Sequence, residues 1–175
     1  MSSMSLRGGH NSENRLVETA SFLVVRLGIN HFALPAAGVR GVLTQGEVGH
    51  EEAVTAAGIV YQSVDLAQRL SVVANLFGPE RRTVLYSTGR FQGAIGVEQV
   101  VGLMDIERKK CLPLPAQFQR DERDWFGGML LYRDQLVLIL NLSWMLGELP
   151  AVVPVPVGRA EPLIKAFSAI VGREC

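Results

Sequence analysis

The sequence has few of the residues on which catalytic and metal sites are usually built. Among its 175 residues there are two cysteines and three histidines. Cys111 and Cys175 lack the paired spacing of a zinc site or a redox motif, so we interpret each as a free thiol in a reducing compartment. His10, His31 and His50 have no helical spacing to one another, and no serine occupies a Gly-x-Ser-x-Gly elbow. We therefore expect no metal, no catalytic triad and no enzyme activity.

A net charge and long apolar runs are also missing, which argues against nucleic-acid-binding and membrane proteins. Lys plus Arg and Asp plus Glu both number 17, and the basic residues form no stripe, so neither nucleic acid nor an anionic membrane is favoured as a partner. The longest aliphatic run, residues 136–140, is far shorter than the roughly 20 residues that span a bilayer. Residues 1–15 lack the apolar core of a secretory signal. We expect a cytoplasmic protein without membrane insertion.

The glycines do not suggest a nucleotide cofactor. Gly89, Gly93 and Gly96 match neither a dinucleotide fingerprint nor a phosphate loop, and they lie in a predicted hairpin, where turns and close backbone contacts account for them. We therefore expect no cofactor.

What is present from Ser21 onward is a series of short apolar runs separated by glycine, asparagine and proline, which is typical of strands. Three hairpins are predicted, over residues 22–34, 82–97 and 127–141. A further strand over residues 58–64 is expected to run into a short helix at 65–70, with Asp65 as its N-cap. Another short helix is predicted at residues 142–146.

Several segments are less regular. Residues 36–44, which begin after Pro35, predict a short helical or irregular piece with Val39, Val42 and Leu43 on one side. Residues 46–52 and 117–124 are polar and are expected to form solvated loops, and residues 107–110 a charged, solvated rim. Trp125, Phe126 and Trp144 could form a stacking platform for single-stranded nucleic acid. Without interleaved Lys and Arg, we interpret them as core residues.

Repetition suggests how the chain is organised. Two blocks of about 60 residues each contain a hairpin and a strand that ends in an Asp or Asn followed by Leu, at residues 59–66 and 136–142. This predicts two similar small barrels with a groove between them, the second lobe having begun by residues 100–106. Residues 1–20 are expected to be a disordered tail, residues 21–149 the two-lobed domain, and residues 150–175 a proline-rich linker and an amphipathic helix. The apolar face of that helix comprises Leu163, Ile164, Phe167, Ile170 and Val171.

Four segments resemble, in order, those of CheW-like chemotaxis domains. They are residues 22–35, 58–66 and 93–101, together with Gly127-Gly128 and residues 136–142. The resemblance implies a mainly β fold of two five-stranded SH3-like barrels around a shared hydrophobic groove, with short helices. It also implies a non-catalytic adaptor that couples methyl-accepting chemoreceptors to a CheA-type histidine kinase. The receptor's cytoplasmic tip would dock in the groove, and the kinase's regulatory domain would pack against barrel ends.

Two positions depart from the family pattern. The usual Val-x-Glu-Ile motif aligns with residues 39–42, where Gly41 replaces the acid, and the usual Asn-Leu-Arg-Gly turn aligns with residues 55–58, where Ala57 replaces the arginine. Because both members of the expected ion pair are absent, no buried charge is left unpaired. The resemblance implies a receptor-facing surface formed by Val39, Gly41, Val42, Ala57, Gly58 and Ile59. The departures leave open a divergent adaptor that serves another pathway.

Two other classes of function are left open by the residues. One is a small-molecule-binding or regulatory β-barrel subunit, which would need an enclosed apolar pocket with a few converging polar groups. The other is a hydrolase, which would rest on Asp65 and scattered serines alone.

Overall fold

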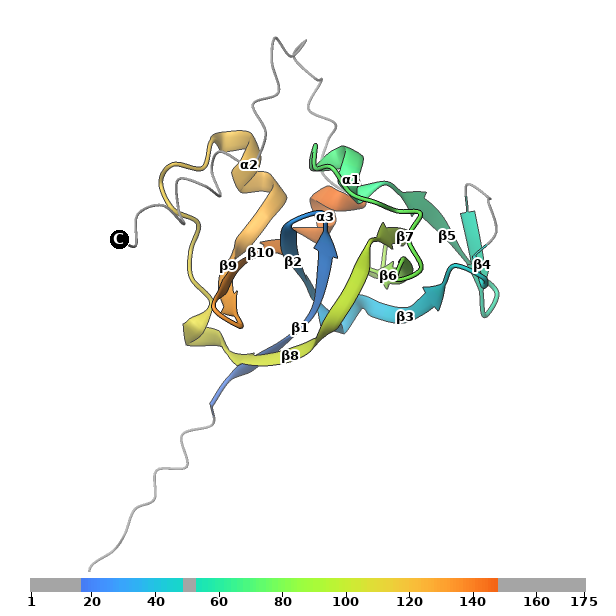
Figure 1. Cartoon of the computed structure of the whole chain (residues 1–175). Helices are drawn as coiled ribbons and strands as arrows, with labels where there is room; N and C mark the ends of the chain where they lie inside the picture. The colour runs from blue at the N-terminus through green and yellow to red at the C-terminus, as the bar shows by residue number, and fades with distance from the viewer. Residues whose placement is uncertain (1–16, 49–52, 148–175) are drawn as a thin grey trace, which may run out of the picture.

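The computed structural model describes residues 17–48 and 53–147 (Figure 1), which form a mainly β domain. The first sheet has the strand order β8 (Gln99–Glu107), β1 (Thr19–Leu27), β2 (Asn30–Pro35), β10 (Gln135–Leu140) and β9 (Phe126–Tyr132). The second sheet has the order β3 (Val39–Thr44), β6 (Arg82–Ser87), β7 (Gln92–Val97), β5 (Ile59–Val64) and β4 (Ala53–Ala56). Each is a curled five-stranded sheet with few short helices around it, so the expected fold class is confirmed.

The two sheets are built on the same plan. In each, an antiparallel hairpin, β1–β2 or β6–β7, pairs in parallel with the last strand of another hairpin, β9–β10 or β4–β5. That last strand leads directly into a short helix, α3 (Leu142–Met145) after β10 and α1 (Leu66–Arg69) after β5. The predicted repeat is therefore present. Asp65 caps α1 as expected, because its carboxylate accepts the N–H of Gln68 at 2.9 Å.

The repeats and the lobes do not coincide, so neither sequence block forms a barrel by itself. The hairpin β1–β2 lies in a sheet with β8, β9 and β10, and the hairpin β6–β7 lies in a sheet with β3, β4 and β5. Each sequence block therefore contributes its first hairpin to the other block's sheet. The physical reason is that each of these hairpins buries both faces. One face packs into a core that both sheets share, and the other packs into a core within a single sheet.

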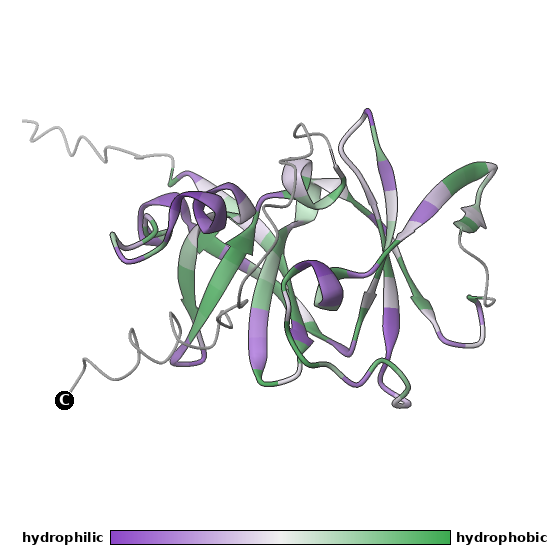
Figure 2. Cartoon of the chain, turned by 90° about the horizontal axis from the view of Figure 1, so that it is seen from above, coloured by the Kyte–Doolittle hydropathy of each residue, from purple (hydrophilic) through white to green (hydrophobic). Residues whose placement is uncertain are grey.

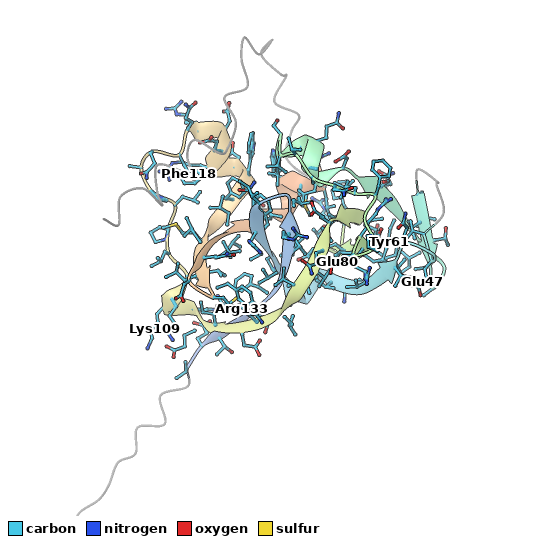
Figure 3. All side chains as sticks on the ribbon, viewed as in Figure 1. Glu47, Tyr61, Glu80, Lys109, Phe118 and Arg133 are labelled. Atoms are coloured by element: carbon cyan, nitrogen blue, oxygen red, sulfur yellow. The ribbon has the colours of Figure 1, made fainter. Side chains whose placement is uncertain are left out.

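The cores follow the alternation of side chains along these strands. Leu23, Val25 and Leu27 of β1 face a large core that also takes side chains from β2, β6, β7, β9 and β10, and we call it the shared core. Phe22 and its neighbours on β2, β9 and β10 form a separate core within the first sheet. Tyr61, Leu85 and Ala94 form the corresponding inner core of the second sheet (Figure 3, where Tyr61 is labelled). Hydrophobic residues, green in Figure 2, are accordingly concentrated on the strands.

Residues 39–44 form a strand and not the helical or irregular piece that was expected. A single 3-10 turn, Ala36–Gly38, is followed by β3, which pairs with β6 along the second sheet. Val39 packs against the shared core, Leu43 packs against the second inner core, and Val42 is exposed, so these three side chains do not share one side. A register shift between Val39 and Gly41 separates the first of them from the others. Pairing with β6 overrides the weak local pattern.

Two further segments differ from expectation. Residues 117–124 are not simply a solvated loop, because Phe118 is buried and meets the ring of Phe126 edge-on, and Arg120–Trp125 form α2 (Figure 3 labels Phe118). A capping box between Gln119 and Glu122 begins that helix. β4 was not predicted, because its short Ala-Val-Thr-Ala sequence becomes a strand only through pairing with β5.

The charged rim has a defined structure. β8 ends at Glu107, and a 3-10 turn, Arg108–Lys110, follows it. Glu107 pairs with Lys109 at 2.7 Å, and Arg108 pairs with Glu18 at 3.1 Å. Glu18, Arg108 and Lys109 are exposed, in agreement with the expected solvated rim, whereas Glu107 is half-buried.

The first strand of the domain begins two residues before the expected boundary at residue 21. Thr19 and Ala20 belong to β1 and pair with β8, so the end of the expected N-terminal tail is a strand. Residues 1–16 of that tail, residues 49–52 of the polar loop, and the proline-rich linker and helix of residues 150–175 lie outside the described residues.

One carboxylate joins three separate parts of the chain. Glu98, between β7 and β8, accepts the backbone N–H groups of Gly28 and Asn75 on one oxygen, each at 3.0 Å. Its other oxygen lies 3.1 Å from the Arg26 guanidinium. The hydrogen bond from Asn75, and with it that from Gly28 and the charge of Arg26, holds the pKa of Glu98 below its usual value against the opposing effect of desolvation.

We predict that Glu98→Gln lowers the free energy of unfolding at pH 7 by about 1–2 kcal/mol, because hydrogen bonds to a charged acceptor are replaced by weaker ones. A carboxyl whose pKa is lower in the folded state stabilises the fold above its unfolded pKa, and this contribution is lost as the pH falls through the folded pKa. Urea unfolding from pH 7 to pH 3 should therefore show the two proteins converging at acid pH. A difference that stays constant over this range would contradict the assignment.

Candidate functional site

The receptor-facing residues implied by the resemblance fall into two groups in the second sheet. Val39, Gly41 and Val42 lie on β3, at one edge of the sheet, whereas Ala57, Gly58 and Ile59 lie at the turn between β4 and β5, toward the other edge. No backbone pairing joins β3 to β4. The curled sheet nevertheless places Leu43 of β3 and Ala56 of β4 against the same inner core.

The two groups differ in exposure. Val39 is half-buried against the shared core and Gly41 is half-buried in β3, whereas Val42 is 41% exposed. A Cβ at Gly41 would lie 3.8 Å from Cδ1 of Leu85, an ordinary contact, so the position has room for the start of a side chain. At the other edge, Ala57, Gly58 and Ile59 are all exposed.

The turn between β4 and β5 has a demanding backbone. Ala56 pairs with Ile59, and the two residues between them have positive φ, 49° at Ala57 and 78° at Gly58. This is the pattern of a type I′ hairpin turn, in which Asn-Gly is favoured and a Cβ at a positive φ is strained. The equivalent hairpin of the first sheet also turns through two residues of positive φ, Arg133 and Asp134.

The first half of β5 exposes an apolar residue, Val60, that was not predicted to face solvent. Within β5, β7 pairs only with Gln62 to Val64, so Ile59 to Tyr61 pair with β4 alone and form one strand of a two-stranded ribbon. Ile59 is 46% exposed and Val60 is 56% exposed, while Tyr61 is buried in the inner core. The apolar run in the sequence signals a strand, but it does not reveal that two adjacent members face solvent.

Tyr86 fixes the start of β3 to the first sheet. Its hydroxyl donates to the carbonyl of Pro35, the last residue of β2, at 2.8 Å, and its ring lies against Gly38. Burial raises the pKa of Tyr86 to about 12, so the hydroxyl remains a donor at neutral pH. These contacts fix the position of the chain just before β3, the strand that carries Val39, Gly41 and Val42.

The aromatic residues belong to the core, as predicted. Phe126 is buried, and Trp125 stacks on Trp144 with ring centroids 5.2 Å apart. Both tryptophans pack against the shared core. Arg69 lies over the Trp144 ring and donates to its backbone carbonyl at 3.0 Å. This arrangement leaves the rings unsuited to a base-stacking platform.

The side chains that could support catalysis or metal binding are not gathered into a site within the described residues. Of the histidines, His31 is in the described part of the chain, where burial and the nearby Arg26 lower its pKa. Within residues 17–48 and 53–147, no three side chains of His, Cys, Asp or Glu gather as a metal site, and no helix is long and apolar enough to cross a membrane. The carboxylate of Asp65, on which the hydrolase hypothesis rested, accepts the helix-capping hydrogen bond.

A pocket of about 300 Å³ opens beside β5, β6 and β7 of the second sheet. Its lining is more polar than the enclosed apolar pocket that the small-molecule hypothesis requires. The polar side chains come from Gln45, Ser63, Asp65, Arg81 and Thr83.

The topology, two five-stranded sheets of one plan with exchanged hairpins, defines a two-lobed β domain. A family model of the CheW-like domain matches residues 21–149. Among solved structures, the chain is similar to the scaffolding protein TtCheW from Thermoanaerobacter tengcongensis, with a TM-score of 0.60 and 14% identity over 79% of this chain and 91% of that chain. The comparison with curated proteins gives no match.

The family match covers most of the chain, and the chain therefore belongs to the CheW-like family. Proteins of this family are non-catalytic scaffolds, and membership supports an adaptor role in chemotaxis.

We predict that Ala57→Gly stabilises the protein by roughly 0.5–1 kcal/mol, because it removes the strain of a Cβ at positive φ while leaving the turn unchanged. The matched control is Ala56→Gly in the adjacent strand position, which should destabilise the protein by a similar amount. Urea unfolding of the three proteins measures both effects. Equal losses in the two variants would show that the turn at Ala57 is not of this type.

Proposed function

We propose that this chain couples methyl-accepting chemoreceptors to a CheA-type histidine kinase in the cytoplasm, without catalysing a reaction. The observation that carries the proposal is the CheW-like match over residues 21–149, joined to apolar residues that stay exposed on β3 and β5. Exposed apolar side chains at strand edges suit a protein partner better than a small substrate.

The receptor contact in this proposal comprises Val39, Gly41, Val42, Ala57, Gly58 and Ile59. Val60, which is more exposed than Ile59, points to the opposite face of β5 and is not part of this contact. The partner would be the helical hairpin at the receptor's cytoplasmic tip, whose apolar side chains can pack against Val42 and Ile59. The kinase's regulatory domain, which has the same fold, would pack against the ends of the sheets. Small contacts of this kind gain strength when they are repeated in an array.

The absence of a charge at Gly41 and Ala57 shapes this contact. Where an ion pair is replaced by Gly and Ala, recognition depends on apolar packing and on the backbone of the turn. Receptor binding through this surface should therefore change little with salt, because screening acts on exposed charges and not on apolar burial.

We predict that Ile59→Asp abolishes receptor binding and leaves kinase binding in place, because it puts a charge in the centre of the apolar contact. The test is co-purification of the wild-type protein and its variants with the kinase and receptors of the same cell, and the expected loss of receptor is at least tenfold. Leu131→Asp is the matched control, because Leu131 is 59% exposed on β9 of the other sheet.

Circular dichroism and thermal unfolding should first confirm that both variants fold. Receptor retained by Ile59→Asp would exclude the proposed surface while leaving the adaptor role intact. A wild-type protein that retains neither kinase nor receptor would overturn the proposed function itself.

A further inference from the structure

The three most exposed large apolar side chains of the described residues come from two neighbouring segments. Val73 is 88% exposed, Phe77 is 87% exposed and Ile29 is 80% exposed. Val73 and Phe77 lie in the loop between α1 and β6, and Ile29 lies in the turn between β1 and β2. A Cβ at Gly28 would lie 2.2 Å from the carbonyl oxygen of Val73, so the turn and the loop are in backbone contact. We call Ile29, Val73 and Phe77 the tip patch.

The backbone that presents the tip patch is fixed by hydrogen bonds. The Glu98 oxygen that accepts the N–H of Gly28 also accepts that of Asn75, each at 3.0 Å, which ties the turn to the loop. The side-chain oxygen of Asn75 in turn accepts the N–H of Phe77 at 3.1 Å. Arg26 pairs with both Glu98 and Glu80 at the edge of this network (Figure 3, where Glu80 is labelled).

The loop also sorts its apolar residues by direction. Val72 is buried and Leu76 packs against the shared core, whereas their immediate neighbours Val73 and Phe77 face solvent. Because the inward residues anchor the loop, the outward pair cannot turn in to bury itself. Apolar side chains held outward on a fixed backbone are characteristic of a surface that another segment covers.

The end of the described chain lies close to this loop. A Cβ at Gly147 would lie 4.0 Å from a guanidinium nitrogen of Arg69, the last residue of α1. The N–H groups of Ser71 and Val72 donate to carbonyls of α1, so the chain passes directly from that helix to Val73. Residues 148–175 therefore continue from a point near the start of the loop that carries the patch.

The sequence of that continuation complements the patch. Residues 148–160 contain Pro150, Pro154 and Pro156, and as an extended proline-rich linker they would reach about 40 Å. Beyond them, residues 161–171 are predicted to form an amphipathic helix, with apolar face Leu163, Ile164, Phe167, Ile170 and Val171. This segment lies beyond the part of the chain that the family model matches.

We propose that the tip patch is the docking site of residues 161–171 of the same chain. Docking would cover two apolar surfaces that otherwise face water, and the tether would supply the high effective concentration that a contact of three side chains needs. The proposal is independent of the receptor and the kinase, because neither partner is needed for the contact.

Cysteine trapping in the full-length protein tests the contact. In a Cys111→Ser, Cys175→Ser background, the pair Val73→Cys and Phe167→Cys should form an intramolecular disulfide under mild oxidation with diamide. The matched control pair is Leu103→Cys and Phe167→Cys, because Leu103 is 66% exposed on β8. We expect at least tenfold faster trapping at position 73. Equal trapping of the two pairs would overturn the proposal, and so would a disulfide-linked dimer at position 73, which would indicate a second copy as the occupant.

Hydrogen exchange provides a second test that needs no cysteines. Amides of residues 161–171 should be protected in the wild-type protein and in Leu103→Asp, and should exchange at least tenfold faster in the double variant Val73→Asp, Phe77→Asp. Both altered side chains are exposed, so the fold itself should tolerate the change. Identical exchange in all three proteins would exclude docking at the tip patch.

Discussion

The exchange of hairpins between the two sheets is the constraint on which the rest of the structure depends. β1–β2 and β6–β7 each complete a sheet whose other strands come from the opposite half of the chain. Their side chains alternate between the shared core and an inner core, so neither sheet can bury its hairpin without the other sheet in place. The two lobes are therefore one folding unit, and a surface that draws on both is held at a fixed geometry.

The same constraint determines which apolar side chains stay exposed. Because the exchanged hairpins are buried on both faces, exposed apolar side chains are left to the edge strands, the ribbon of β4 and β5, and the turns and loops. The ribbon extends beyond the pairing with β7, so Ile59 and Val60 remain outside both cores. Glu98 connects two of these exposed segments. Its carboxylate accepts backbone N–H groups from the β1–β2 turn and from the loop after α1, which would otherwise be unpaired.

Much of the fold could be predicted because its signals are local. The hairpins at β1–β2, β6–β7 and β9–β10 follow from short apolar runs around turns, and Asp65 signals its own helix. The assignment of strands to sheets could not be predicted. An apolar run indicates that a strand is buried on both faces, but it does not indicate which core each face packs against. β3 and β4 escaped prediction for a related reason: their sequences are weak, and pairing with β6 and β5 makes them strands. Similarly, nothing in the sequence marks Phe118 as an anchor within a polar segment.

The candidate site shows what a family pattern transfers and what it does not. The pattern placed the expected ion pair at Gly41 and Ala57, and the structure puts one of these on β3 and the other in a turn of positive φ. Ala57 therefore differs from the family pattern in two ways. It lacks the charge of the arginine, and it places a Cβ at a positive φ in a turn that glycine or asparagine would adopt with less strain. The turn beside Ile59 is exposed, and its backbone conformation carries a cost in stability. With no charge at Gly41 or Ala57, the receptor contact proposed above would depend on shape and apolar burial.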